Sequence, residues 1–364
     1  MPNLSPSCPP CPTPNSNNDD KSLNELPKAR FWEAMDICQW EGFWFEPGLV
    51  KSAITFRSSF HARDDDILLT STMKTGTTWL KALSLCIMQN KTHQKNDDIL
   101  TTENPHFHVP TIESIIYSTK APQVDLYDTS APRLLHTHLP YAVLPDSVKN
   151  SACKVVYIAR NPKDTLISMW HFFNSIFRSN QDPFPLEKIV DCFCSGVHQY
   201  GPFFEHVVEY WQESQKGLRK YCFSNEKEVD EILWRCSLER LKNLEVNKNG
   251  FVIFPVPNNS YFRKGEVGDW KNYLTTEMEE QINQTSRIKL EPFGFADFMD
   301  PTEVSSSRHM ASSSSPPPAL PMDSSIIVIE PSILETKADI KLMALHKRTI
   351  YISPPAHKKG PDKT

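Results

Sequence analysis

The feature that most constrains the fold is a β-type apolar run that passes through a short polar loop into a helical pattern. The run Leu68–Thr70 is followed closely by Lys74-Thr75-Gly76-Thr77-Thr78-Trp79 and then by apolar residues at helical spacing. Gly76 allows close backbone approach to a ligand, and the first amides of a helix are unpaired donors at the positive end of its dipole. Lys74 adds a full positive charge. The segment therefore predicts a binding site for a phosphate or sulfate group.

The order of residues in this loop disfavours an ordinary nucleoside triphosphate site. That motif needs an early glycine and a Gly-Lys-Ser/Thr ending, whereas here Lys74 precedes Gly76 and no glycine opens the loop. A phosphotransferase of the Walker type is therefore not expected. A plain strand-to-helix turn with a threonine cap would produce a similar string, so the loop alone does not decide between the two interpretations.

Composition and charge exclude several classes of protein. The chain has 364 residues, of which 39% are hydrophobic, enough to bury a sizeable core. A net charge of -5 gives no general attraction to nucleic acid, so an anion site requires a local concentration of cations. There is no run of 18 apolar residues and no signal-like start, which predicts a cytoplasmic protein with no membrane span.

The cysteines favour reduced thiols over a disulfide framework or a metal site. There are nine, an odd number, scattered through apolar contexts. Cys8 and Cys11 form the only CxxC pair, which stands in a proline-rich tail without a second Cys/His pair at zinc spacing. We expect this pair to be incidental.

Proline and serine content defines the domain organisation. Of the 30 prolines, seven lie in residues 1–30 and nine in residues 301–364. Residues 1–30 and 300–364 are therefore predicted to be disordered tails, and the apolar run Ile326–Ile329 is too short to build a core. A single domain is expected over residues 31–299.

Within that domain, short apolar runs alternate with helical patterns. Strands are expected at Ile67–Thr70, Leu134–His138, Lys154–Ala159 and Phe251–Val256. Helices are expected at Thr77–Gln89, Pro162–Phe177, Leu186–Gln215, Val229–Leu241 and Thr276–Arg287. This alternation predicts an α/β fold with a parallel sheet flanked by helices and with ligands at the carboxyl ends of the strands.

A second strand-to-helix junction predicts another anion site. Arg160-Asn161-Pro162-Lys163-Asp164 places a guanidinium at the end of a strand and a proline in the first helical turn. Ser168 follows about two turns into the helix, where its hydroxyl could join Arg160 on one phosphate. The alternative is an arginine in a surface salt bridge.

Two further motifs carry candidate chemistry. Arg263-Lys264-Gly265 forms a loop with adjacent cations, for which solvated surface charge is the alternative. His136 and His138 alternate on one strand face, but no third ligand for a metal is evident nearby. His138 at the strand end could instead act as a general base, while a core or surface histidine is the alternative.

Taken together, the four motifs resemble those of cytosolic sulfotransferases, which use 3′-phosphoadenosine 5′-phosphosulfate (PAPS). The loop at Lys74, the His136-Thr137-His138-Leu139-Pro140 segment, the Arg160 motif and Arg263-Lys264-Gly265 occur in the order and approximate spacing of that family. Plant-type members are most similar, over about residues 31–295. The resemblance implies one α/β domain with a five-stranded parallel sheet, a P-loop-like phosphosulfate-binding loop, and no metal.

The resemblance also assigns roles to individual residues. The 5′-phosphosulfate would be held by Lys74, Thr75, Gly76, Thr77 and Thr78, with Trp79 stacked on adenine. The 3′-phosphate would be bound by Arg160, Ser168, Arg263, Lys264 and Gly265. His138 would take the proton from the acceptor hydroxyl while Lys74 stabilises charge on the leaving phosphate.

The acceptor and the oligomeric state follow less directly from this resemblance. Aromatics such as Trp44, Phe107 and Phe173 stand where the family lines its acceptor site, although such residues are more often part of a core. A small hydroxylated acceptor is implied, and flavonoids, steroids and hydroxyjasmonate all remain open. The segment Lys271 to Glu280 is similar to a family dimer motif and implies a weak homodimer; a capped helix start is the alternative.

The sequence departs from the family in several places. Met73 stands where a proline is usual, and Leu238 replaces an aromatic beside adenine. After Ser214, only Gln215 to Glu228 fill a stretch where the family has a further strand and helix, and the C-terminal tail is atypical. A missing strand would leave backbone groups unpaired. The alternative function is therefore a catalytically impaired nucleotide-binding protein or a misfolded isoform.

Overall fold

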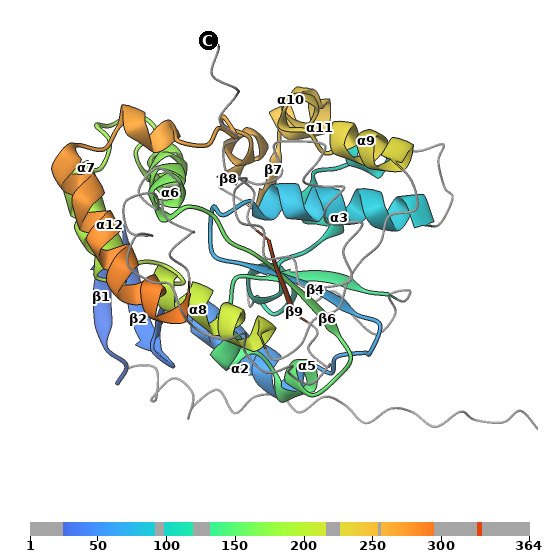
Figure 1. Ribbon diagram of the computed structural model, residues 1–364, viewed down its shortest axis with the longest axis horizontal. Coiled ribbons are helices and arrows are strands. Elements are labelled where there is room, and N and C mark those ends of the chain that lie inside the picture. Colours follow the sequence, from blue (N-terminus) through green and yellow to red (C-terminus); the bar gives the residue numbers. More distant parts are fainter. Residues whose placement is uncertain are drawn as a thin grey trace, which may run out of the picture.

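The computed structural model describes residues 25–91, 98–118, 132–215, 226–253, 256–294 and 326–329 (Figure 1). Most of the two tails that are predicted to be disordered lies outside these residues, as do Cys8 and Cys11. All six cysteines that the structure describes are free thiols. None of the described helices is both long and apolar enough to cross a bilayer.

The centre of the domain is a parallel sheet. Its described strands lie in the order β5-β4-β6-β9, with β4 (Ile67–Ser71) between β5 (Leu134–Thr137) and β6 (Lys154–Ile158). All of these pairings are parallel, which confirms the predicted α/β fold with a parallel sheet. The loops that follow β4, β5 and β6 therefore emerge at one edge of the sheet.

The strands of this sheet are buried on both faces. In β6, Val155 and Tyr157 pack into one apolar cluster, whereas Val156 and Ile158 pack into another. Successive side chains of a strand point to opposite faces, so each face of the sheet is covered by its own core. This explains why β6 is an uninterrupted apolar run and not an alternating one.

The fourth strand comes from the C-terminal tail. Residues Ile326–Ile329 form β9, which pairs with β6 from Val155↔Ile326 to Ile158↔Ile329 and lies beside α8 (Phe203–Ser214). The structure thus places these four residues in a strand, within a tail that the sequence predicts to be disordered. Four residues show no decisive periodicity, and only the edge of β6, distant in the sequence, supplies their hydrogen-bonding partners.

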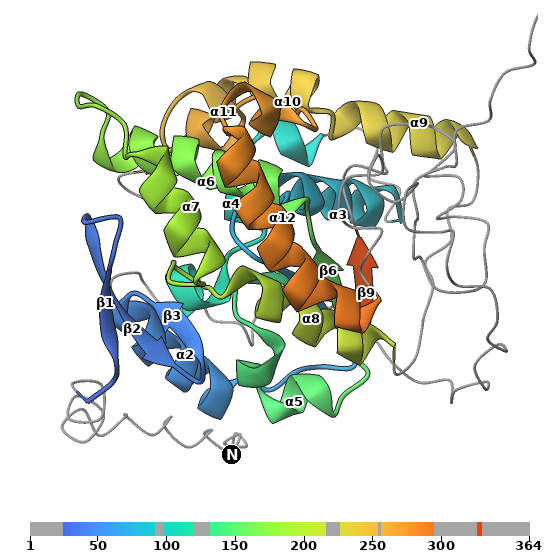
Figure 2. The same ribbon diagram turned by 60° about the vertical axis from the view of Figure 1, so that its left-hand side comes forward.

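Helices cover both faces of the sheet (Figures 1 and 2). On one side lies α3 (Thr77–Lys91) with α9 (Glu226–Arg235), α10 (Leu238–Asn243) and α11 (Glu245–Lys248), and on the other side lies α8. Beside the sheet, α12 (Thr276–Leu290) packs against α6 (Pro162–Phe177), α7 (Leu186–Cys194) and α8. Two one-turn helices complete the described α-helices of this region, α4 (Pro105–His108) and α5 (Asp146–Lys149).

Two helices that bear on the candidate site begin where the sequence predicts. At the start of α6, the Asn161 side chain accepts hydrogen bonds from the amides of Lys163 and Asp164, and Pro162 occupies the first turn. At the start of α12, the Thr275 hydroxyl accepts from the Met278 amide at 3.3 Å. These caps satisfy amides that have no partner within the helix.

Two of the predicted helices are each broken in two. The expected helix Leu186–Gln215 divides into α7 and α8 because Gly196 and Tyr200 have positive φ and Pro202 immediately precedes α8. The expected helix Val229–Leu241 divides into α9 and α10 because the Ser237 side chain caps a new helix by accepting from the Arg240 amide.

Other differences from the sequence prediction lie outside the main sheet. The expected strand Phe251–Val256 forms a separate antiparallel pair, β7 (Phe251–Ile253) with β8 (Val256–Pro257). A three-stranded antiparallel sheet and a helix near the N-terminus were not anticipated. They are β1 (Lys28–Phe31), β2 (Met35–Trp40), β3 (Phe43–Phe45) and α2 (Pro47–Ser59).

Candidate active site

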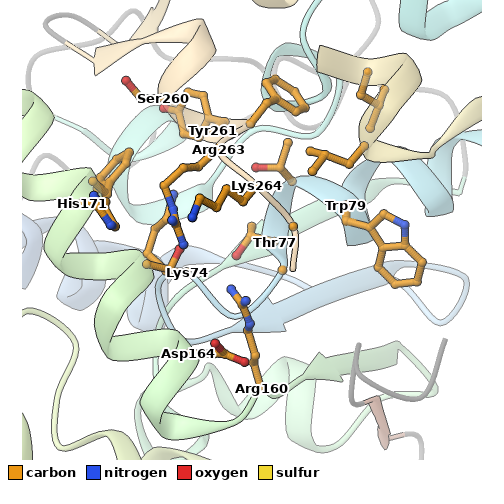
Figure 3. A pocket seen from close by; sticks show the side chains of 18 of the residues that line it. Lys74, Thr77, Trp79, Arg160, Asp164, His171, Ser260, Tyr261, Arg263 and Lys264 are labelled. Carbon is orange, nitrogen blue, oxygen red and sulfur yellow. The ribbon is translucent and has the colours of Figure 1, made fainter. Parts of the chain in front are cut away.

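A cavity of about 720 Å³ opens where the loops after β4, β5 and β6 meet (Figure 3). Its volume lies in the range usual for small-molecule sites. It brings together nearly all the residues that the sequence singles out for donor binding and chemistry: Lys74, Gly76, Thr77, Thr78, Trp79, His138, Arg160, Ser168, Arg263, Lys264 and Gly265. Three segments that are far apart in the sequence therefore contribute cations to one cavity.

The loop after β4 has an unusual backbone conformation. Lys74 has a φ of +65°, a region that non-glycine residues rarely occupy, and Gly76 has a φ of +114°. Thr75 does not line the cavity. Its buried hydroxyl donates to the Thr72 carbonyl at 2.9 Å and lies 3.2 Å from the Ile158 carbonyl, so it anchors the loop to the end of β6. Such local strain, held by surrounding structure, is typical of ligand-binding loops.

The Lys74 ammonium lies in the cavity, and no carboxylate among the described residues forms an ion pair with it. Its Nζ is 4.1 Å from the ring centroid of Phe172 and 5.9 Å from that of Tyr261. Burial, together with the positive charges of Arg160 and Arg263, lowers the pKa of Lys74 to about 7. These causes all disfavour a positive charge, and the negative charge of an anion bound here would offset them and favour the protonated lysine.

The second group of cations is held by a buried carboxylate. Arg263 Nη1 donates to Asp269 Oδ2 at 2.6 Å, and Lys264 Nζ donates to Asp269 Oδ1 at 2.8 Å. Burial of Asp269 opposes its ionisation, but the bonds from Lys264 and Arg263 outweigh this effect and lower its pKa to about 2. Arg160 reaches the same loop by donating to the Glu266 carbonyl at 3.0 Å. These cations are thus positioned at the cavity and are not simply solvated loop charges.

His138 presents one ring nitrogen for chemistry. Its Nδ1 lies 2.9 Å from the backbone carbonyl of Ser71, and a carbonyl can only accept, so Nδ1 carries the hydrogen and Nε2 keeps a lone pair. Burial lowers the pKa of His138 to about 3, so the ring is neutral at pH 7. Glu113 fixes the end of β5 by accepting from the Thr137 hydroxyl and the His138 amide, each at 2.8 Å.

Several residues at the site were not predicted from the sequence. Asp164 accepts from the Gly268 amide at 2.9 Å and so ties α6 to the Gly265 loop. Tyr261 and His171 line the cavity, and burial lowers the pKa of His171 to about 4. Both Asp164 and Tyr261 stand inside or next to the quoted motifs, but nothing in their spacing distinguishes a supporting residue from its neighbours.

The aromatic residues suggested for the acceptor lie outside this cavity. Phe173 packs in the core with ring centroids 5.0 Å from Phe31 and 5.2 Å from Trp32, while its neighbour Phe172 lines the cavity. Trp44 lies against the core, and Phe107 is half exposed. On a helix, adjacent residues point in directions about 100° apart, so Phe172 and Phe173 cannot face the same site. Among the residues that the structure describes, no group of three or more His, Cys, Asp or Glu side chains could hold a metal ion.

The fold and the cavity together define an α/β protein with a cavity, lined by cations from three segments, at the carboxyl ends of its strands. A sequence profile of the sulfotransferase domain matches residues 64–223 and 218–294. The chain belongs to the sulfotransferase family. The match divides at residues 218–223, within the segment that is shorter than the family pattern.

Similar proteins agree with this assignment. Cytosolic sulfotransferase 12 of Arabidopsis thaliana is 35% identical over 301 residues, which cover 75% of this chain and 91% of the relative. Cytosolic sulfotransferase 5 of the same plant is 37% identical over 311 residues, covering 76% and 96%. The alignment with the first of these relatives has 301 positions, more than the 75% of this chain's 364 residues that it covers. Some aligned residues of that relative therefore have no counterpart in this chain.

Solved structures of the family have the same fold. An Arabidopsis thaliana sulphotransferase has a TM-score of 0.56 and 31% identity, covering 78% of this chain and 98% of the other. A mouse sulfotransferase complexed with PAP has a TM-score of 0.51 and 25% identity, covering 70% and 93%. The predicted family and fold class are therefore confirmed.

Proposed function

We propose that this protein transfers the sulfuryl group of PAPS to a hydroxyl group of a small acceptor in the cytoplasm. The observation that carries the proposal is the convergence on one cavity of cations from three segments: Lys74, just before the N-terminus of α3, then Arg160, and the pair Arg263 and Lys264. This arrangement fits a ligand with anionic groups at two ends, as in PAPS. The complex of the mouse relative with PAP supports the same interpretation.

In this proposal, His138 acts on the acceptor oxygen, which gains a bond to sulfur, and Lys74 acts on the 5′-phosphate oxygen, which loses one. The lone pair on His138 Nε2 takes the proton from the acceptor hydroxyl as its oxygen bonds to sulfur. The bond from sulfur to the 5′-phosphate oxygen breaks, and its electron pair leaves on that oxygen, where the Lys74 ammonium stabilises the charge. The negative charge of the donor raises the pKa of His138 from its low value and so makes the ring a better base.

The remaining residues bind and orient the donor. The amides at the start of α3 and the hydroxyls of Thr77 and Thr78 are the donors for its 5′ end. Arg160 with Ser168, and Arg263 with Lys264 and Gly265, hold the 3′-phosphate. Trp79 supplies a flat surface for adenine, with Leu238 on the opposite wall. We propose a flavonoid, a steroid or hydroxyjasmonate as the acceptor, and a weak homodimer through Lys271 to Glu280.

Two measurements on the full chain test the proposal. Melting with and without 3′-phosphoadenosine 5′-phosphate (PAP) should show one cooperative transition that the ligand raises. Incubation with labelled PAPS and pooled phenols and steroids should then give labelled acceptors. A raised transition with no transfer would favour the impaired nucleotide-binding protein, and absence of a cooperative transition would favour a misfolded isoform. Stronger stabilisation by ATP than by PAP would contradict the proposed donor.

A further inference from the structure

A buried lysine beneath the candidate site is joined to two of its hydroxyl groups. Lys81 lies on α3, one turn after Thr77 and Thr78, and its side chain is fully buried. Its Nζ lies 3.0 Å from Thr111 Oγ1 and 3.1 Å from His106 Nδ1. The function proposed above makes no use of Lys81, Thr111 or His106, yet burying a charged group without a role is costly.

The first branch from Lys81 ends at Thr78. When Lys81 is protonated, its ammonium group can only donate, so His106 Nδ1 accepts and the hydrogen of the neutral His106 ring is on Nε2. His106 Nε2 lies 2.8 Å from Thr78 Oγ1 and therefore donates to it. The Thr78 oxygen accepts this bond, which leaves its own hydrogen for a ligand in the cavity.

The second branch ends at Thr77. Thr111 Oγ1 accepts from Lys81 and donates to His136 Nδ1 at 3.1 Å, which places the hydrogen of the His136 ring on Nε2. His136 Nε2 lies 3.0 Å from Ser71 Oγ, and Ser71 Oγ lies 2.7 Å from Thr77 Oγ1. Each oxygen along this branch accepts from one neighbour and donates to the next. The Thr77 hydrogen is again the one left for the cavity.

We propose that Lys81 is a positioning residue that sets the direction of both hydrogen-bond chains, so that Thr77 and Thr78 face the cavity as donors. A hydroxyl rotates freely when nothing fixes it, and in the wrong direction it would place a lone pair against an anionic oxygen. Fixing the direction in advance removes that reorganisation when the anion binds. The inference rests on the proposed function, since it requires an oxyanion at this end of the cavity.

The direction of the chains can be observed without any substitution. In ¹⁵N-histidine-labelled protein at pH 6, where Lys81 with its pKa of about 7 is mostly protonated, the nitrogen chemical shifts report which ring nitrogen carries the hydrogen. We expect the Nε2–H form for His106 and His136 and the Nδ1–H form for His138. The Nδ1–H form at either His106 or His136 would overturn the inference, whether or not the protein binds PAP.

A double-mutant cycle then tests whether the chains act through the threonines. His136→Leu should weaken PAP binding about tenfold, the value of a hydrogen bond to a charged group. In the Thr77→Val background, His136→Leu should have almost no further effect on PAP binding, because the hydroxyl that His136 orients is absent. In the Thr78→Val background, His136→Leu should keep its full effect. His106→Leu should show the reverse dependence, and His136→Gln, which keeps one acceptor and one donor, should bind nearly as the parent does.

Three outcomes of the cycle are decisive. Equal losses in all backgrounds would show a merely structural role for His136 and His106 and would overturn the inference. No loss in any background would do the same. Failure of the parent protein itself to bind PAP would refute the proposed function, and the histidine measurement would then still decide the direction of the chains.

Discussion

The Asp164 carboxylate on α6 accepts a hydrogen bond of 2.9 Å from the backbone amide of Gly268. This contact joins the two segments that supply Arg160 and Arg263 to the same cavity. Asp164 is 2% exposed, and its second oxygen lies 3.4 Å from the Trp270 amide. One buried carboxylate thus sets the distance between the two halves of the proposed 3′-phosphate site.

Replacement of Asp164 should therefore weaken binding as well as stability. Asp164→Ala should destabilise the fold by about 1.5–3 kcal/mol, the usual value for a hydrogen bond to a charged group, and weaken PAP binding about tenfold. Thermal melting and calorimetric titration measure the two effects. Asp182→Ala, at an exposed position, is the matched control and should change neither. Unchanged binding by Asp164→Ala would show that the Gly265 loop holds its place without α6.

Lys74 should matter for the chemical step more than for folding. Lys74→Ala removes the cation that we place on the leaving phosphate, and loss of one such donor typically lowers the rate roughly a hundredfold or more. The measurement is the rate of transfer from labelled PAPS, with Lys188→Ala as the control because Lys188 forms an exposed ion pair with Glu33. An unchanged rate in Lys74→Ala would contradict the assignment of the site.

Binding of the donor should be linked to protonation of Lys74. The pKa of the free protein's Lys74 is about 7, and bound phosphate should raise it. At pH 6 the lysine is protonated in both states, so little proton uptake is expected, whereas at pH 8 it is mostly neutral when free and protonated when bound. Uptake at pH 8 should therefore approach about one proton, and the affinity should fall as the pH rises above 7.

Calorimetry in buffers of different ionisation enthalpy measures this uptake. Lys74→Met should abolish it. Uptake that persists in this variant would assign the titration to another group, of which Lys81 is the nearest in pKa, also lowered to about 7 by burial.

Gly265 should be more sensitive than an ordinary turn glycine. It has a φ of +68°, and an added Cβ would collide with the Leu238 side chain. Gly42 has a similar φ of +84° with nothing near the corresponding position, so Gly42→Ala carries the strain of the backbone alone. Gly265→Ala should lower PAP affinity and melting temperature, whereas Gly42→Ala should lower only the latter. Equal PAP affinities of the Gly265→Ala and Gly42→Ala variants would show that Gly265 does not contribute to the binding site.

The strand β9 should be required for stability. A chain that ends at Ser325 lacks Ile326–Ile329, whereas one that ends at Glu330 keeps them. We expect the shorter chain to melt at a lower temperature, since a few strand hydrogen bonds at about 1 kcal/mol each are lost. The chain that ends at Glu330 should melt at the same temperature as the full chain. Identical melting of all three chains would show that the pairing of β9 with β6 contributes nothing.

The sequence predicts best what is encoded locally. Gly76 and the threonines at a strand-to-helix junction indicate the loop from Lys74 to Trp79. In the same way, Asn161-Pro162 indicates the start of α6. Both signals depend on neighbours within a few residues. The parallel pairing of β4 with β5 and β6 follows from the alternation of strands and helices, but the order of the strands in the sheet does not.

What the sequence did not predict depends on distant partners. Asp164 and Gly268 are joined only by the fold, and no local pattern shows that this acid supports a loop. The role inferred for Lys81 rests on bonds to Thr111 and His106, which α3 meets only after folding. Phe172 and Phe173 are neighbouring residues of the same type, and only the orientation of α6 decides which one faces the cavity.

The position of β9 also has a consequence for the order of events during synthesis. The residues that pair with Val155–Ile158 on this edge of β6 are Ile326–Ile329, so this part of the sheet cannot form until synthesis has reached Ile329. Contacts of such long sequence separation slow folding, and an unpaired strand edge invites association with other chains in the meantime. We therefore expect the nascent protein to depend on chaperones until β9 has been synthesised.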